Sequence, residues 1–205
     1  MYKRILSALS LSIFAIAPAF AADGGSMSDA ERAFLLDQMA ASKKIFLESI
    51  KGLNETQWHF KPAPEVWSVA ECAEHIILAE DFIFNASQGI LKTPTVDRLE
   101  SGTLEHDKMF AMAITDRSRK ATAPEPIKPG NKIATPEEAA KTFVEKRDAH
   151  MAYVKSSNDE LRLHTADGPV GKMDAYQFLV LMASHTARHT AQIKEVEANA
   201  NYPAK

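Results

Sequence analysis

Four short segments of this chain are typical of helix N-termini, and their order constrains the fold more than any other feature of the sequence. Residues 28–31 (SDAE) and 68–71 (SVAE) are capping boxes, in which a serine and a glutamate three residues later satisfy backbone amides at a helix start. Residues 135–138 (TPEE) place a proline and two acidic residues in a first turn. Residues 174–177 (DAYQ) begin with an aspartate, which is a favourable N-cap.

Each segment opens a stretch in which apolar residues recur at three- and four-residue steps, which is the helical period. The sequence therefore predicts four long helices, at about 28–51, 68–91, 135–156 and 174–199. The connection over residues 93–135 is too long for a structureless loop in a compact domain. We expect an accessory helix there, over residues 104–120, followed by a proline-rich extended segment.

Two shorter connections complete the expected fold. Residues 53–67 carry two prolines and two tryptophans, which predicts an ordered linker, and residues 158–173 carry turn signals at Gly168 and Gly171. Strand-like alternation is not evident in the sequence. The chain is therefore predicted to be all-α, a four-helix bundle with a long crossover between its second and third helices (up-down-down-up).

The first 22 residues have the composition of a secretory signal peptide. Residues 3–4 (KR) are basic, residues 5–17 are mostly apolar, and residues 19–21 (AFA) form a cleavage site. The apolar run is shorter than the roughly 20 residues that span a bilayer, so we expect no stable membrane anchor. These features predict a periplasmic or secreted protein that begins near Ala22, with the bundle domain over residues 23–205.

Charge and cysteine content narrow the function classes. The formal net charge is −3, and no Lys/Arg-rich run follows residue 4, so we expect no nucleic-acid partner. The single cysteine, Cys72, excludes an internal disulfide. It lies on the apolar stripe of the second predicted helix, which favours a core position over a role as a nucleophile.

Two histidines interrupt the apolar stripe of the last predicted helix. His185 and His189 are four residues apart and lie on one helical face. The stripe they interrupt consists of Phe178, Met182, Ile193 and Val196. Burying two imidazoles among apolar side chains costs free energy unless their nitrogens find partners. A shared divalent metal ion would satisfy both, although this spacing also occurs in helices that bind no metal.

Of the remaining five histidines, His75 is the one placed on an inward helical face by its register, one turn after Cys72. The other four are expected to be ordinary surface or hydrogen-bonded residues: His59, His106, His150 and His164.

Three segments together resemble the DinB-like superfamily. They are residues 60–62 (FKP), residues 67–76 (WSVAECAEHI) and residues 185–193 (HTARHTAQI), and the resemblance spans about residues 28–196. It implies a four-helix bundle with a long crossover after its second helix. It also implies a divalent metal held by one histidine of the second helix and two of the fourth, which here are His75, His185 and His189.

Three imidazole ligands leave a coordination position open, which is typical of catalytic rather than structural zinc sites. The resemblance and this ligand count predict a metal-dependent enzyme, with hydrolysis of a small molecule as the expected reaction. Nickel, iron and manganese also suit imidazole ligands, so the sequence does not choose among these metals and zinc.

Three further residues are candidates for catalysis on helical faces near the histidines. Arg188 is predicted to orient an anionic substrate, and Gln192 to donate a hydrogen bond to a ligand, with a position on a solvated helix flank as the alternative for both. For Glu71, a role as general base competes with its role as a helix cap.

Two alternatives remain open at this point. One is a non-catalytic module that binds a metal or a stress-related ligand. The other is a thiol-dependent S-transferase or isomerase, as in cytosolic relatives of the superfamily, although export counts against it. A homodimer is compatible with the sequence.

Overall fold

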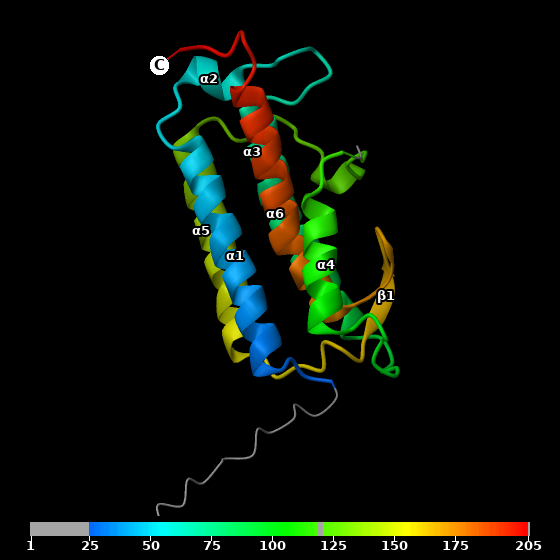
Figure 1. The fold of residues 1–205 in the computed structure, drawn as a ribbon. Coiled ribbons are helices and arrows are strands. Elements are labelled where there is room, and N and C mark those ends of the chain that lie inside the picture. The colour runs from blue at the N-terminus through cyan, green and yellow to red at the C-terminus, as the bar shows by residue number, and fades with distance from the viewer. Residues whose placement is uncertain (1–24, 119–120, 205) are drawn as a thin grey trace, which may run out of the picture.

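The computed structural model describes residues 25–118 and 121–204, so the predicted leader over residues 1–22 lies outside the described residues. Four long helices form the bundle (Figure 1). They are α1 (Asp29–Ile50), α3 (Val69–Ile90), α5 (Pro136–Ser156) and α6 (Ala175–Glu197). In Figure 1, α1 and α6 ascend while α3 and α5 descend, which is the predicted up-down-down-up topology.

The four long helices begin and end within two residues of their predicted bounds. Ser28 and Glu31 form the expected capping box at the start of α1. Asp174 caps α6 and is itself part of a capping box with Gln177. The helix ends are therefore set locally, by side chains that satisfy free backbone amides.

The crossover contains helix α4 (Leu104–Thr115) and the short 3₁₀ helix η1 (Glu125–Ile127). The accessory helix ends earlier than the expected 104–120, because Asp116 adopts an extended backbone conformation and its carboxylate accepts a hydrogen bond from the Ser118 amide at 2.9 Å. Arg188 of α6 donates to the carbonyl oxygens of Ile114 and Asp116 at this end of α4.

The prediction of a helical bundle is confirmed, and the structure adds one short hairpin to it. Strands β1 (Thr165–Gly168) and β2 (Gly171–Asp174) pair antiparallel within the connection predicted as a loop. Strands of four residues are too short to show a clear alternation in the sequence. A Cβ at Gly168 would lie 2.4 Å from the Met173 sulfur, so the absence of a side chain lets Met173 pack across the hairpin.

The expected linker at residues 53–67 also contains a short helix, α2 (Glu55–His59). Asn54 and Gln57 form a capping box at its start, which was not predicted. The helix places Trp58 in the core with no exposed surface.

A polar layer divides the core of the bundle into two apolar clusters. Each long helix contributes a buried polar side chain to this layer, and the four are Ser42, Glu80, Arg147 and Thr186. One apolar cluster lies toward the start of α1 and includes Met39, Ile83, Val154 and Leu179. The other lies toward the end of α1 and includes Phe46, Ile76, Phe143 and Ile193.

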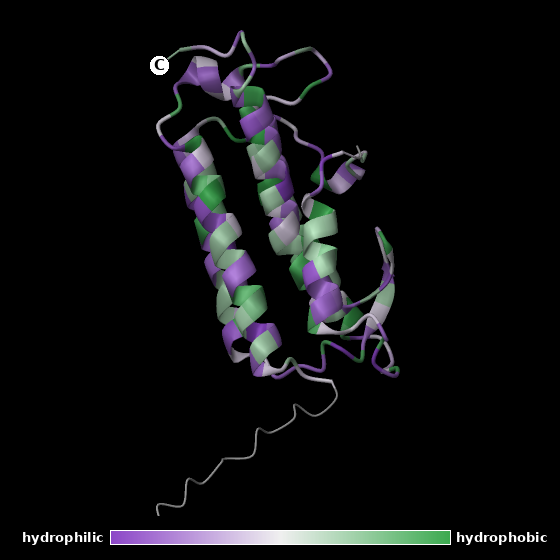
Figure 2. Ribbon diagram, viewed as in Figure 1, coloured by the Kyte–Doolittle hydropathy of each residue, from purple (hydrophilic) through white to green (hydrophobic). Residues whose placement is uncertain are grey.

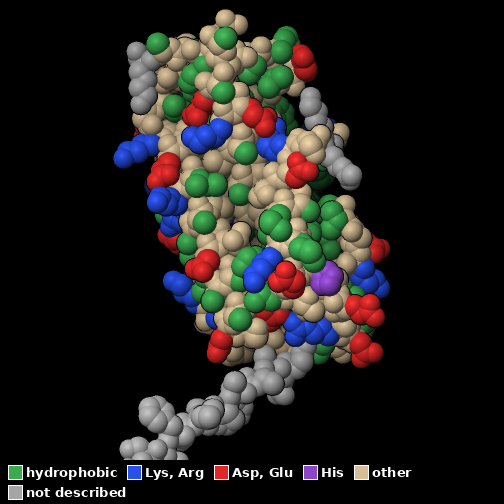
Figure 3. All heavy atoms as spheres, viewed as in Figure 1, with side chains coloured by type: hydrophobic (Ala, Val, Ile, Leu, Met, Phe, Trp, Pro, Cys, Tyr) green, Lys and Arg blue, Asp and Glu red, His purple; other side chains and the backbone are tan. Residues whose placement is uncertain are grey.

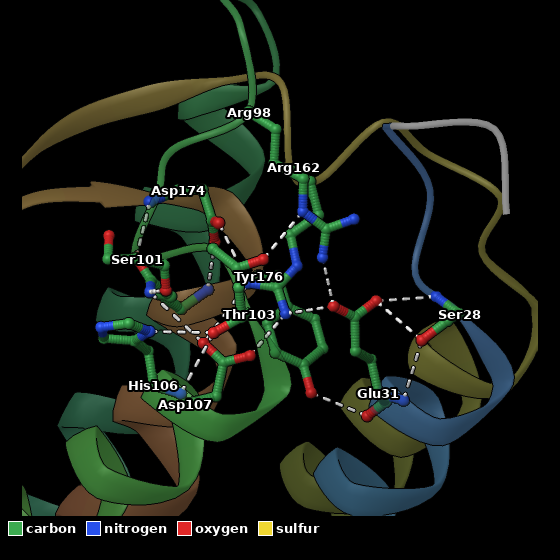
Figure 4. Close-up of polar contacts among 12 residues, drawn as sticks. Ser28, Glu31, Arg98, Ser101, Thr103, His106, Asp107, Arg162, Asp174 and Tyr176 are labelled. Carbon is green, nitrogen blue, oxygen red and sulfur yellow. Dashed lines mark hydrogen bonds and ion pairs between the residues drawn. The ribbon is translucent and has the colours of Figure 1, made fainter. Parts of the chain in front are cut away.

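A second buried ionic cluster joins the N-terminal ends of three helices (Figure 4). Arg162 donates to Glu31 of α1 at 2.7 Å, to Asp107 of α4 at 2.5 Å and to Asp174 of α6 at 3.0 Å. Its guanidinium also lies over the ring of Tyr176, 3.8 Å from the centroid. The cluster fixes one end of α4 against the bundle.

The long helices are amphipathic, with one face buried in the bundle and the other exposed to solvent. Hydrophilic and hydrophobic residues interleave along the helices in Figure 2, and charged side chains of both signs mix with hydrophobic ones on the face drawn in Figure 3. Within the residues that the structure describes, no helix is both long enough and apolar enough to cross a membrane.

Candidate metal centre

The three histidines singled out in the sequence converge between α3 and α6. The Nε2 atom of His75 lies 3.2 Å from Nε2 of His185 and 3.2 Å from Nε2 of His189. All three ligand atoms lie within 4.8 Å of one another, and this is the one group of three or more potential metal ligands found among residues 25–118 and 121–204. The antiparallel packing of α3 against α6 brings together residues 110 or more positions apart.

The protonation of His75 follows from its hydrogen bond to the main chain. Its Nδ1 atom lies 2.7 Å from the carbonyl oxygen of Ile127 in η1. A carbonyl oxygen can only accept, so Nδ1 carries the proton and donates. In the neutral imidazole, Nε2 is then left with a lone pair directed at the other two histidines.

The protonation of His189 follows in the same way from Gln192. The Nδ1 atom of His189 lies 2.8 Å from Gln192 Oε1. Arg117 donates to the same Oε1 atom at 3.2 Å, and a guanidinium has no acceptor, so the Gln192 atom facing both partners is the carbonyl oxygen. His189 therefore also donates from Nδ1 and presents a lone pair on Nε2.

The Nε2 atoms of His75 and His189 lie 3.2 Å apart, and because both carry a lone pair and no proton, they repel one another and cannot form a hydrogen bond. Zinc–imidazole bonds of about 2.0–2.1 Å place tetrahedral ligand nitrogens about 3.3 Å apart. The observed separations of His75 from His185 and His189 match that spacing. The residues present therefore fit a divalent metal ion.

The electrostatics keep the three imidazoles uncharged. Burial lowers the pKa of His75, and the hydrogen bond to Ile127 only partly offsets this effect. Burial is also the largest cause that lowers the pKa of His185 well below its ordinary value and that of His189 to about 3. The neighbouring imidazoles and Arg188 act in the same direction on both, and the hydrogen bond to Gln192 opposes the change at His189. Near neutral pH all three rings are in the form that binds metals.

The three histidines differ in exposure. His75 is 2% exposed, whereas His185 and His189 are only partly buried. The half-buried ring of Trp67 flanks the group, with its centroid 4.8 Å from that of His75 and 6.1 Å from that of His189. Trp67 was not among the predicted site residues, although its position next to the cap of α3 was visible in the sequence.

The three residues predicted as candidates for catalysis make different kinds of contact in the structure. Arg188 donates to backbone carbonyls at the end of α4, and its predicted role toward an anionic substrate stays a prediction. Gln192 contacts His189 but accepts the hydrogen bond, whereas it was predicted to donate one. Glu71 accepts from the Ser68 amide at 2.7 Å and pairs with Lys61, which is the capping role.

The other four histidines lie apart from this group. His59 and His106 are exposed. His150 is buried, stacks on Phe84 with ring centroids 4.1 Å apart, and contacts Glu80 of the polar layer. The Nδ1 atom of His164 lies 2.7 Å from the carbonyl oxygen of Thr93.

Comparison with known proteins identifies the family. Residues 38–193 match the model of the DinB superfamily, which is more than half of the chain. This chain belongs to the DinB superfamily. The match confirms the resemblance inferred from the tryptophan and histidine segments, and it includes all three histidines of the candidate centre.

Two proteins of Bacillus subtilis are similar to this DinB-superfamily chain. The uncharacterised protein YuaE is 22% identical over 149 residues, which cover 72% of this chain and 88% of YuaE. The solved structure of YfiT superposes with a TM-score of 0.58 at 13% identity, covering 87% of this chain and 92% of YfiT. YfiT is described as a probable metal-dependent hydrolase with an unusual four-helix bundle topology. At this identity the likeness to YfiT shows the fold.

Proposed function

We propose that this DinB-superfamily protein is a metal-dependent hydrolase that holds one divalent ion on His75, His185 and His189 and acts on a small molecule. The observation that carries the proposal is the separation of 3.2 Å between the Nε2 atoms of His75 and His189. Both Nδ1 atoms donate hydrogen bonds, so each Nε2 atom carries a lone pair. A cation between these nitrogens removes their repulsion. The description of the structural neighbour YfiT supports the same reaction class.

Three protein ligands favour a catalytic site over a structural one, because a structural zinc site usually has four. A divalent ion bound there would supply a Lewis acid able to lower the pKa of a water molecule from about 15.7 to about 7. The residues of this chain keep the three imidazoles neutral and hold the rings of His75 and His189 in one direction, and His185 and His189 are partly exposed to solvent.

We also propose that the protein acts outside the cytoplasm, after removal of residues 1–22. The basic start, the apolar run and the AFA site support this proposal. Export disfavours chemistry that depends on cytosolic thiols, which is why hydrolysis is proposed before thiol transfer.

Metal analysis of the purified mature protein tests the ligand set. We expect about one divalent ion per chain, and a sharp loss of occupancy in His75→Ala, His185→Ala or His189→Ala. His59→Ala is the matched control, because His59 is exposed and lies outside the group. Equal metal loss in the control would mean non-specific uptake and would overturn the site.

A panel of ester, amide and phosphoester substrates tests the reaction class. We expect turnover that a chelator abolishes and added metal restores. A fully metallated protein with no turnover on any substrate class would instead favour the binding-module alternative. Turnover that depends on an added low-molecular-weight thiol would favour the transferase alternative.

A further inference from the structure

We propose that Arg117 is a positioning residue for the metal centre, which holds the Gln192 amide in one orientation and thereby keeps His189 in the tautomer that can bind a metal. The link to metal affinity rests on the proposed function. The link from Arg117 to the tautomer of His189 does not, because it concerns the protein without metal. Arg117 lies two residues after α4 in the crossover, far in sequence from all three histidines.

The direction of the Arg117 guanidinium is fixed by a carboxylate of α6. Its Nε and Nη2 atoms donate to the two oxygens of Glu195 at 2.6 and 2.7 Å. This fork-to-fork pairing sets the plane of the guanidinium as well as its position. The remaining terminal nitrogen, Nη1, then points at Gln192 Oε1, one helical turn earlier on α6, at 3.2 Å.

Gln192 can face His189 in two ways, and only one suits a metal ligand. With the carbonyl oxygen toward the ring, the amide accepts from Nδ1 and leaves a lone pair on Nε2, as observed. With the NH₂ group toward the ring, the amide would donate to Nδ1, and the single ring proton would move to Nε2. A protonated Nε2 cannot bind a metal ion.

Arg117 favours the first of these two orientations, because a guanidinium can only donate hydrogen bonds. The flipped amide would place the NH₂ group of Gln192 against Arg117 Nη1, which opposes two donors. The orientation of Gln192 is therefore determined by Arg117, and the tautomer of His189 by Gln192.

Residues of the crossover thus support two of the three histidines of the centre. Ile127 contacts His75 through its main-chain carbonyl, and Arg117 acts on His189 through Gln192. Helix α4 packs against α6, and Arg188 of α6 binds the C-terminal end of α4. Arg117, which follows this end of α4, therefore lies next to Gln192. The long crossover therefore both connects α3 to α5 and orients two side chains of the metal centre.

The test compares Arg117→Met with Lys194→Met as a matched control. Lys194 is a neighbouring cation on α6 that is largely exposed and pairs with Glu197, so its loss removes one charge without touching Gln192. In the metal-free protein, ¹⁵N NMR of the imidazoles should show His189 protonated at Nδ1 in the wild type and in Lys194→Met. In Arg117→Met we expect a substantial population protonated at Nε2. Metal affinity should fall about 10–100-fold in Arg117→Met alone.

A rescue variant separates positioning from mere stability. A carboxylate presents an acceptor on both oxygens, so Arg117→Met with Gln192→Glu should restore the Nδ1-protonated form and most of the metal affinity. An unchanged His189 tautomer in Arg117→Met would overturn the proposal. So would equal effects of Arg117→Met and Lys194→Met. A tautomer change in a protein that binds no metal would support the positioning role while overturning the metal site itself.

Discussion

Arg147 of α5 and Glu80 of α3 form an ion pair at the centre of the bundle, where their side chains are 0% and 1% exposed. All five donors of the guanidinium are used, because Arg147 also donates to Met39, Ser42 and Thr186. Burial alone would raise the pKa of Glu80, but the charge of Arg147 and the hydrogen bonds to the carboxylate outweigh this effect and lower it. The pair therefore stays charged and anchors the polar layer that joins all four long helices.

Removing one partner of this pair should be costly. We expect Arg147→Met to lower the free energy of unfolding by about 3–5 kcal/mol, because it leaves the carboxylate of Glu80 buried without its counter-charge. Urea denaturation measures this change. The double variant Arg147→Met with Glu80→Leu should recover much of the loss, since it removes the uncompensated charge as well. A double variant no more stable than Arg147→Met would contradict this account.

The Arg162 cluster should give the protein a distinct pH response. Burial raises the pKa of Asp174 to about 6, above the ordinary value near 3.9, although Arg162 opposes the change. The folded chain therefore takes up this proton at a higher pH than the unfolded chain. The stabilising contribution of Asp174 is full below about pH 4 and is lost as the pH rises through 6.

Asp174→Asn isolates that contribution, because asparagine keeps the N-cap but cannot titrate. Asp107, Glu31 and Arg162 remain in both proteins, so the comparison cancels most of their own pH dependence. We expect wild-type stability relative to Asp174→Asn to increase between pH 7 and pH 4, by an amount on the order of 2 kcal/mol. Denaturant titrations at several pH values provide the measurement. A constant difference would show that Asp174 does not titrate in this range.

Cys72 should behave as an inert core residue. It has no exposed surface, and burial raises the pKa of its thiol above the ordinary value. We expect Cys72→Ala to lose only about 1 kcal/mol of stability and to keep its full metal content. In the wild type, a thiol reagent should react only after unfolding. Metal loss in Cys72→Ala would make the thiol a fourth ligand.

The leader prediction is tested by intact-mass measurement on protein from the native host. We expect a chain that starts near Ala22, which leaves the packed residue Gly25 and its hydrogen bond from Arg162 in place. A soluble product that retains Met1 would contradict the prediction of export.

The bundle was predictable because its signals are local. Capping residues and apolar periodicity set the ends of α1, α3, α5 and α6, and the register of α3 and α6 put His75 and His189 on inward faces. The contacts of the crossover were not predictable in this way. A carbonyl such as that of Ile127 has no sequence signature, and Arg117 and Gln192 meet only through tertiary packing across 75 positions.

The two supports of the metal centre also differ in how they can be lost. Gln192 supports His189 with a side chain, so a single codon change removes the contact. Ile127 supports His75 with its backbone, and every amino acid offers the same oxygen at that place. The support of His75 is therefore insensitive to the identity of the residue beside it and depends only on the path of the chain, which a deletion or insertion in the crossover would shift.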